Sequence, residues 1–331
     1  MVKLNSKRSG EFALIAKLFA PLSKNAPGAF GLLDDAALIK PRAGHEQVIT
    51  ADALIEGVHF LRGDPPETIA KKALRVNLSD LAAKGAAPEG YLLTLALPDW
   101  QDMAWLENFA RGLAEDQREY GISLFGGDTT ATPGFLTIAI TAFGLIPEGK
   151  MLRRAGAKSG ELVFVSGTIG DGGGGLAVLK NEFTGLSPTD RDYLTSRYRL
   201  PTPRVTLGQA LRGIASSALD VSDGLIADLG HIADVSGVHI VVEAARMPLS
   251  PALKQAWGTT IEAIARAATS GDDYEITFTA PASSRERVMQ AAKDSGTPVT
   301  EIGRVEAGQG VALLDAGGRE VPLARKGFAH F

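Results

Sequence analysis

The chain has 331 residues, 45% of them hydrophobic, which is more than one core usually uses and predicts two domains of ordinary size. Its 34 Lys and Arg residues against 38 Asp and Glu residues give a formal net charge of -4, which excludes the overall basic field typical of nucleic-acid-binding proteins. The absence of Cys excludes disulfides, thiolate zinc sites, iron–sulfur clusters and cysteine nucleophiles.

No segment of the sequence predicts export or membrane insertion. The N-terminus is basic but lacks the long apolar run and the small-residue cleavage pattern of a signal peptide. The longest apolar run, at 135–146, is about half of the ~20 residues needed to cross a bilayer. Since a chain without Cys also fits a reducing compartment, we expect a cytoplasmic protein with no membrane partner.

The first half of the chain alternates helical and strand patterns. Phe12, Ile15 and Phe19 follow one helical face, whereas the long helix opened by Pro66 carries its apolar stripe as far as Gly85. The predicted elements, in chain order, are a helix at 10–20, strands at 36–39 and 47–51, a helix at 65–85, a strand at 91–97, a helix at 98–121, and strands at 123–128 and 135–146.

A polar, glycine-bearing and basic segment at 147–161 predicts a connection between domains 1–148 and 149–331. The second half also mixes helices and strands and contains a glycine-rich loop at 167–175. Its predicted elements are a strand at 162–166, a helix through 176–179, helices at 203–216 and 224–236, and strands at 239–242 and 274–279.

Aspartates recur in both halves beside glycine or at the ends of apolar runs. Mg²⁺ takes oxygen ligands, usually a few carboxylates together with substrate phosphates, so this inventory favours magnesium over zinc. Each aspartate alone also fits a helix cap or a tight turn. The aspartates are Asp34, Asp35, Asp52, Asp80, Asp128, Asp220, Asp223, Asp272 and Asp273.

Three other features allow two interpretations each. The glycine loop at 167–175 could present backbone N–H groups to a phosphate, or its glycines could only allow close packing. Arg153 and Arg154 could clamp a phosphate or be solvated. His59 could contact a ligand or be a hydrogen-bonded core histidine.

An ordered set of motifs closely resembles the thiamine-monophosphate kinase family over essentially the whole chain. That family shares its superfamily with aminoimidazole ribonucleotide synthetase and selenophosphate synthetase. The motifs are GEFALI at 10–15, LLDDAAL at 32–38, TADALIEGVHF at 50–60, KKALRVNLSDLAAKGA at 71–86, LFGGDTT at 124–130, RAGAKSGE at 154–161, GTIGDGGGG at 167–175, LDVSDGLIADLGHI at 219–232, SGDDYEI at 270–276 and KGFAHF at 326–331.

The resemblance implies a two-domain α+β fold of the aminoimidazole ribonucleotide synthetase-like kind. Its mixed α/β N-terminal domain would bind ATP and Mg²⁺ and pair into a homodimer, and its C-terminal α+β domain would carry the glycine-rich loop. The implied reaction is direct transfer of the γ-phosphoryl group of ATP onto thiamine monophosphate, giving thiamine diphosphate and ADP. Positioning and metal charge, rather than a general base, would drive this transfer.

The resemblance also assigns roles to individual residues. The implied ligands of several Mg²⁺ ions are Asp35, Thr50, Ala51 through its carbonyl, Asp52, Asp80, Asp128, Asp220 and Asp223. The implied ATP contacts are Gly127, Asp128, Arg154 and Ser222. The implied contacts to thiamine monophosphate are His59, Asp272 and Arg325.

The chain departs from the family pattern at four positions. Leu33 stands where glycine usually precedes the paired aspartates, and Ala51 replaces a common threonine. Asp272 shortens a usual glutamate, and Arg325 takes a position that is often aromatic and covers the thiamine rings. The last two departures concern substrate contact, and none removes a core magnesium aspartate.

Other members of the superfamily are the nearest alternatives. Selenophosphate synthetase uses a reactive Cys or selenocysteine, and the hydrogenase-maturation relative uses a C-terminal Cys, so the absence of Cys argues against both. Aminoimidazole ribonucleotide synthetase has different acceptor-site motifs. A protein of another class, which keeps the fold but only binds nucleotide or buffers metal, is disfavoured because the whole carboxylate set persists.

Overall fold

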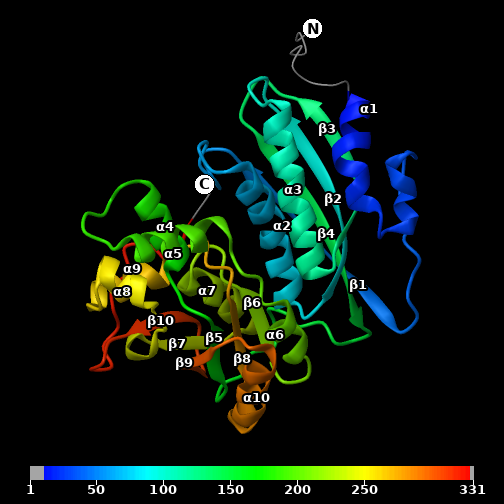
Figure 1. The fold of residues 1–331 in the computed structure, drawn as a ribbon. Helices are drawn as coiled ribbons and strands as arrows, with labels where there is room; N and C mark the ends of the chain where they lie inside the picture. The colour runs from blue at the N-terminus through cyan, green and yellow to red at the C-terminus, as the bar shows by residue number, and fades with distance from the viewer. Residues whose placement is uncertain (1–10, 329–331) are drawn as a thin grey trace. The chain divides into compact units, whose positions relative to one another are not determined.

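A computed structural model describes residues 11–328, so Gly10 of the first motif and the last three residues of KGFAHF lie outside the described part. Within it, the chain forms two compact units (Figure 1). The N-terminal unit comprises residues 11–81 and 87–149, and the C-terminal unit comprises 82–86 and 150–328. In the described range, no helix is both long and apolar enough to span a membrane.

The N-terminal unit is built on a four-stranded sheet in the order β1-β4-β2-β3. Strand β4 is antiparallel to both of its neighbours, whereas β2 and β3 are parallel and are joined by helix α3, as a parallel crossover requires. The elements are α1 (Glu11–Leu14), a π-helix (Ile15–Phe19), 3-10 helices (Ala20–Ser23 and Pro27–Leu32), β1 (His45–Ile55), α2 (Pro66–Ala83), β2 (Ala87–Leu97), α3 (Met103–Tyr120), β3 (Ser123–Ala131) and β4 (Thr137–Pro147).

Helices α2 and α3 cover one face of this sheet (Figure 1). The side chain of Asp102 accepts from Trp105 N–H at the start of α3, and Gly121 ends the helix with a left-handed φ of 67°. Between the helices, the guanidinium of buried Arg75 donates to both carboxylate oxygens of Asp116 at 2.7 Å. Such a paired, two-bond contact fixes how α2 and α3 pack.

The predicted strand at 36–39 is wrong. This segment is an irregular loop. Its backbone is hydrogen-bonded to the 3-10 helix Pro27–Leu32, where Leu38 N–H donates to Gly28 O at 2.8 Å. Its side chains are largely exposed, because a short apolar run forms a strand only where a neighbouring strand completes its hydrogen bonds. The predicted helix at 10–20 is broken into α1, the π-helix and a 3-10 turn that contains Pro21.

The C-terminal unit is built on a six-stranded sheet in the order β10-β7-β9-β5-β8-β6, in which only β10 and β7 are parallel. Its strands are β5 (Leu162–Ser166), β6 (Ser217–Asp220), β7 (His239–Glu243), β8 (Ile276–Ala280), β9 (Val299–Glu306) and β10 (Gly310–Leu314). Its helices are α4 (Asp171–Leu179), α5 (Pro188–Arg199), α6 (Val205–Ala210), α7 (Leu225–Ser236), α8 (Pro251–Trp257), α9 (Ile261–Ala268) and α10 (Arg285–Ser295), with 3-10 turns at Ala244–Arg246 and Ala282–Ser284.

Both faces of this sheet are buried. Val163 and Val165 of β5 enter one hydrophobic cluster, whereas the intervening Phe164 enters another and stacks on Phe278. This alternation is the period of two that a strand imposes on its side chains. The predicted helix at 203–216 is shorter in the structure because α6 ends at Ala210 and the chain then turns through Gly213, which has a φ of 70°.

Candidate active site

One group of predicted ligands lies on strand β1 and helix α2 of the N-terminal unit. Thr50 Oγ1 donates a hydrogen bond to Asp80 Oδ2. Asp52 lies two residues after Thr50, so both side chains project from the same face of β1. Burial, followed by repulsion from Asp80, raises the pKa of Asp52 to about 6.

Helix α2 places Asn77 one turn before Asp80 on the same side of the helix. Asn77 is fully buried, its amide nitrogen donates to Ala73 O at 3.0 Å, and its Oδ1 has no hydrogen-bond partner. The hydroxyl of Thr50 and the carboxylates of Asp52 and Asp80 are hard oxygen donors of the kind that Mg²⁺ takes, and Asn77 adds an unsatisfied amide oxygen on the same side of α2.

A second group of predicted ligands lines a cavity of about 710 Å³ in the same unit. Asp34 and Asp35 line it from the loop between the 3-10 helix Pro27–Leu32 and β1, and Gly127 and Asp128 line it from β3. A side chain at Gly127 would place its Cβ 1.8 Å from Leu93 O, so only glycine allows β3 to approach β2 here.

The strand register separates these two groups. Asp52 pairs with Ile140, which pairs with Leu93, and both partners are buried beneath the helices. Asp128 pairs with Thr94, the next residue of β2, and therefore projects from the opposite face. Within residues 11–328, no three His, Asp or Glu side chains come close enough together to hold a metal ion without further groups.

His59 has a structural hydrogen bond. Its Nδ1 accepts from Ile55 N–H at 3.0 Å, which places the proton of the neutral ring on Nε2. The carbonyl of His59 also accepts from Lys72 Nζ at 2.9 Å. The turn after β1 is therefore fixed from both sides, and the ring orientation is set by the backbone.

In the C-terminal unit, Asp220 ends strand β6, and Ser222 and Asp223 form the loop that enters α7. A buried residue that the sequence analysis did not single out, Asp228, holds this loop. Its Oδ2 accepts from the N–H groups of Ser222, Asp223 and Gly224 at 3.0–3.2 Å. Burial and then repulsion from Asp223 raise the pKa of Asp228 to about 7, although the three amides oppose the shift.

The SGDDYE segment lies against the same loop. Asp272 N–H donates to Ser222 O and Tyr274 N–H donates to Val221 O, both at 2.8 Å. Asp272 and Tyr274 adopt left-handed backbone conformations, with φ values of 70° and 52°. The structure thus brings the predicted ATP contact Ser222 next to the predicted substrate contact Asp272.

The glycine loop at 167–175 supports the packing interpretation. Buried Asp273 accepts from Gly170 N–H at 2.6 Å and from Gly172 N–H at 3.0 Å, so these amides are already paired with a carboxylate. A Cβ at Gly172 would lie 2.3 Å from Asp272 O, and one at Gly175 would lie 2.1 Å from Leu194 O. These glycines allow α4 to approach its neighbours closely.

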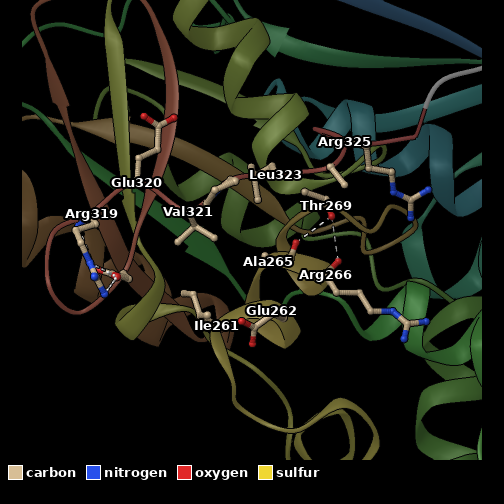
Figure 2. Close-up of a pocket in the computed structure, with 13 residues that line it drawn as sticks. Ile261, Glu262, Ala265, Arg266, Thr269, Arg319, Glu320, Val321, Leu323 and Arg325 are labelled. Carbon is tan, nitrogen blue, oxygen red and sulfur yellow. Dashed lines mark hydrogen bonds and ion pairs between the residues drawn. The ribbon is translucent and has the colours of Figure 1, made fainter.

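Two predicted arginine contacts are exposed. Arg154 follows Arg153, whose carbonyl accepts from Ala218 N–H at 2.8 Å and so holds the segment beside β6. Arg325 lines a cavity of about 710 Å³ between helix α9 and the C-terminal segment. Figure 2 shows its side chain near Thr269 at one end of this cavity, whose lining does not include Asp272.

Leu33 does not require glycine geometry, because its φ of -103° is available to any residue. Neighbouring Phe30 and Leu32 have positive φ values of 49° and 59° instead. The departure from the family pattern at Leu33 is therefore accommodated without backbone strain at that residue.

Comparison with known proteins identifies both halves of the chain. Residues 33–146 match the AIR synthase related protein N-terminal domain, and residues 158–315 match the corresponding C-terminal domain. The chain is 45% identical over 324 residues to thiamine-monophosphate kinase of Caulobacter vibrioides, covering 97% of this chain and 90% of that protein. It is 42% identical over 324 residues to that of Escherichia coli, covering 97% and 98%.

Solved structures agree. The thiamine-monophosphate kinase from Stenotrophomonas maltophilia matches with a TM-score of 0.85 and 42% identity, covering 94% of this chain and 98% of that one. AaThiL complexed with AMPPCP and TMP matches with a TM-score of 0.77 and 33% identity, covering 92% and 97%. The hydrogenase maturation protein HypE in complex with ATP shares the fold, with a TM-score of 0.78, at only 19% identity. The chain therefore belongs to the AIR synthase related protein family and, within it, to the thiamine-monophosphate kinases.

Proposed function

We propose that this protein transfers the γ-phosphoryl group of ATP to the phosphate of thiamine monophosphate, giving thiamine diphosphate and ADP. The observation that carries the proposal is identity of 42–45% with thiamine-monophosphate kinases over 97% of the chain. The related AaThiL complex with AMPPCP and TMP supports it, because that ligand pair stands for a phosphoryl donor and an acceptor.

The acceptor needs little chemical activation. A phosphate monoester has a second pKa of about 6, so near neutral pH it is already largely a dianionic nucleophile. The obstacle is repulsion between two polyanions, which positioning and electrostatic stabilisation must overcome. Magnesium, when bound, supplies the positive charge that offsets this repulsion.

The oxygen donors Thr50, Asp52 and Asp80 on β1 and α2 suit the binding of magnesium between the two polyanionic substrates. Burial, and after it repulsion from Asp80, raises the pKa of Asp52, and a cation bound between the two carboxylates would offset both effects. The proposed magnesium ligands fall into three groups, for more than one ion: Thr50, Ala51 through its carbonyl, Asp52 and Asp80 on β1 and α2; Asp35 and Asp128 at the cavity on the opposite face of the sheet; and Asp220 and Asp223 in the C-terminal unit.

The remaining roles follow the family pattern. Gly127, Asp128, Arg154 and Ser222 are proposed to contact ATP, and His59, Asp272 and Arg325 are proposed to contact thiamine monophosphate. Residues 1–148 would carry ATP and metal binding together with dimerisation, and residues 149–331 would supply Ser222 and Asp272. Because ATP is supplied in the cytoplasm, we place the reaction there.

The N-terminal unit has an exposed apolar surface that suits a homodimer. Ile49, on edge strand β1, is 65% exposed, and Leu92 on β2 is 39% exposed. Edge strands and apolar sheet faces are usually covered in the native assembly. We propose that a second copy of the chain covers the β1 side of this face, whereas the cavity that Asp128 lines lies at the other edge of the sheet, beside β3.

Ile49→Lys should therefore convert a dimer to a monomer, because a buried, unpaired ammonium opposes association. Light scattering after size exclusion would give the mass of each form. Val235→Lys, at an exposed apolar residue of α7 in the C-terminal unit, is the matched control and should stay dimeric. A monomeric parent protein, or a dimeric Ile49→Lys variant, would refute this surface.

Arg325→Ala should change the KM for thiamine monophosphate by less than about threefold. The side chain is exposed, and its long flexible stem must be ordered to bind, so it should cover the substrate rings less effectively than a rigid aromatic residue would. Steady-state kinetics at saturating ATP would measure the change. A rise of about tenfold or more would mean that Arg325 binds substrate strongly.

Purified protein should be incubated with ATP, Mg²⁺ and thiamine monophosphate, and its products separated by chromatography. Thiamine diphosphate and ADP formed in equal amounts would support the proposal. ADP without thiamine diphosphate would point to another acceptor, and no ADP at all would favour a silent nucleotide-binding protein.

A further inference from the structure

Two buried aspartates bind the backbone of the loops that carry Ser222 and Asp272. Asp228, 2% exposed, accepts from three consecutive amides of the loop that contains Ser222. Asp273, fully buried, accepts from Gly170 N–H and Gly172 N–H and is the neighbour of Asp272. Neither carboxylate belongs to the proposed set of metal or substrate contacts.

Asp273 anchors a strained turn. The residues on both sides of it, Asp272 and Tyr274, have left-handed φ values of 70° and 52°, which non-glycine residues adopt at a cost. The two bonds to the glycine loop hold this turn down, and Tyr274 Oη donates to Asp272 Oδ1 at 3.1 Å. The amides of Asp272 and Tyr274 also bond the neighbouring loop at Ser222 and Val221, so the Asp273 side chain contributes the bonds that fix this turn, and with it the Asp272 carboxylate, against the glycine loop.

The two anchors differ in what they require of the side chain. Asp273 uses one oxygen for each amide, so asparagine would place an NH₂ group against an N–H donor. Asp228 uses a single oxygen, Oδ2, for all three amides, so the carbonyl oxygen of asparagine could replace it. This difference allows a test by conservative substitution.

We propose that Asp228 and Asp273 are positioning residues for different substrates: Asp228 orients the ATP-contacting loop at Ser222, and Asp273 orients the turn that presents Asp272 to thiamine monophosphate. The inference rests on the proposed function, which assigns those contacts. It adds two residues that act through backbone hydrogen bonds and touch neither substrate.

Steady-state kinetics of the full chain would separate the two roles. Asp228→Ala should raise the KM for ATP by about tenfold or more and that for thiamine monophosphate by less than about threefold. Asp273→Asn should raise the KM for thiamine monophosphate by about tenfold or more and that for ATP by less than about threefold. Asp228→Asn should restore the KM for ATP to within about threefold of the parent value.

Asp171→Asn is the matched control. Asp171 is fully buried in the first turn of α4, where it accepts from the hydroxyls of Thr168, Tyr193 and Ser250, which can rotate, and forms a long 4.0 Å ion pair with Arg197. The melting temperature of the Asp171→Asn variant should fall, whereas both of its KM values should stay within about twofold of the parent values. If a change in KM came only from lost stability, it would appear in Asp171→Asn as well as in the Asp228 and Asp273 variants.

Equal changes in both KM values for Asp228→Ala and Asp273→Asn, or unchanged KM values, would overturn the proposal. If Asp273→Asn fails to fold, Asp273→Ser replaces it, because serine keeps an acceptor without the opposed NH₂ group. Asp273→Ser should also raise the KM for thiamine monophosphate more than the KM for ATP.

Amide hydrogen exchange tests the anchors without turnover. Asp273→Asn should accelerate exchange about tenfold or more at 170–172, and Asp228→Ala should do so at 222–224. Unchanged exchange would overturn the inference even if the parent protein is a kinase. A parent protein that makes no thiamine diphosphate would instead refute the proposed function.

Discussion

Asp52→Asn should reduce kcat by about a thousandfold or more while making the metal-free protein more stable. The substitution removes a carboxylate from the proposed metal site, and it also removes a buried charge that Asp80 repels. A group whose pKa rises from 3.8 to about 6 on folding opposes folding when charged. We expect the stability gain to be about 1–3 kcal/mol near pH 8.

The gain should depend on pH in a defined direction. The parent protein loses stability as pH rises from the unfolded pKa of 3.8 through the folded pKa of about 6, because Asp52 becomes charged in that interval. The advantage of Asp52→Asn should therefore be full above this interval and disappear below it. Urea unfolding in EDTA at several pH values would measure it. An active Asp52→Asn enzyme, or one less stable than the parent above pH ~7, would contradict the assignment.

Asp128→Asn should also reduce kcat by about a thousandfold or more, but without a gain in stability. Asp128 is exposed on the opposite face of the sheet and lines the cavity that contains Asp35. Removing an exposed charge usually changes the free energy of unfolding by less than about 0.5 kcal/mol.

Kinetics and urea unfolding of Asp128→Asn, measured beside Asp52→Asn, would check this contrast. Exposed Thr130 on the same strand offers a control, and Thr130→Ala should retain activity. Asp128→Asn with parental kcat would remove Asp128 from the site. A stability gain equal to that of Asp52→Asn would mean that the two carboxylates share one repulsive cluster.

The sequence predicted the parts of the fold that carry strong local signals. Strand β5 begins and ends as predicted, at Leu162 and Ser166, and α2 and α3 lie within their predicted ranges. The strand at 36–39 failed because its pairing depends on a partner that periodicity does not reveal. Helix α5 (Pro188–Arg199) was missed because its sequence is mostly polar, although Ser187 caps it and Pro188 opens it.

The positioning residues could not be predicted in the same way. In the sequence, Asp228 looks like any aspartate in the first turn of a helix. Only the folded structure shows that its carboxylate accepts from three amides of the preceding loop. Asp273 was noticed only as one of a pair beside glycine, and its partners Gly170 and Gly172 are about a hundred residues away. The one signal in the sequence was that each is an acidic residue inside a motif shared with the family.

The most direct measurement follows the label from [γ-³²P]ATP in the presence of Mg²⁺ and thiamine monophosphate. Direct transfer predicts that the label appears in the terminal phosphate of thiamine diphosphate, with one ADP formed for each product molecule. Label found only in inorganic phosphate, or AMP formed in place of ADP, would contradict direct γ-phosphoryl transfer by this protein.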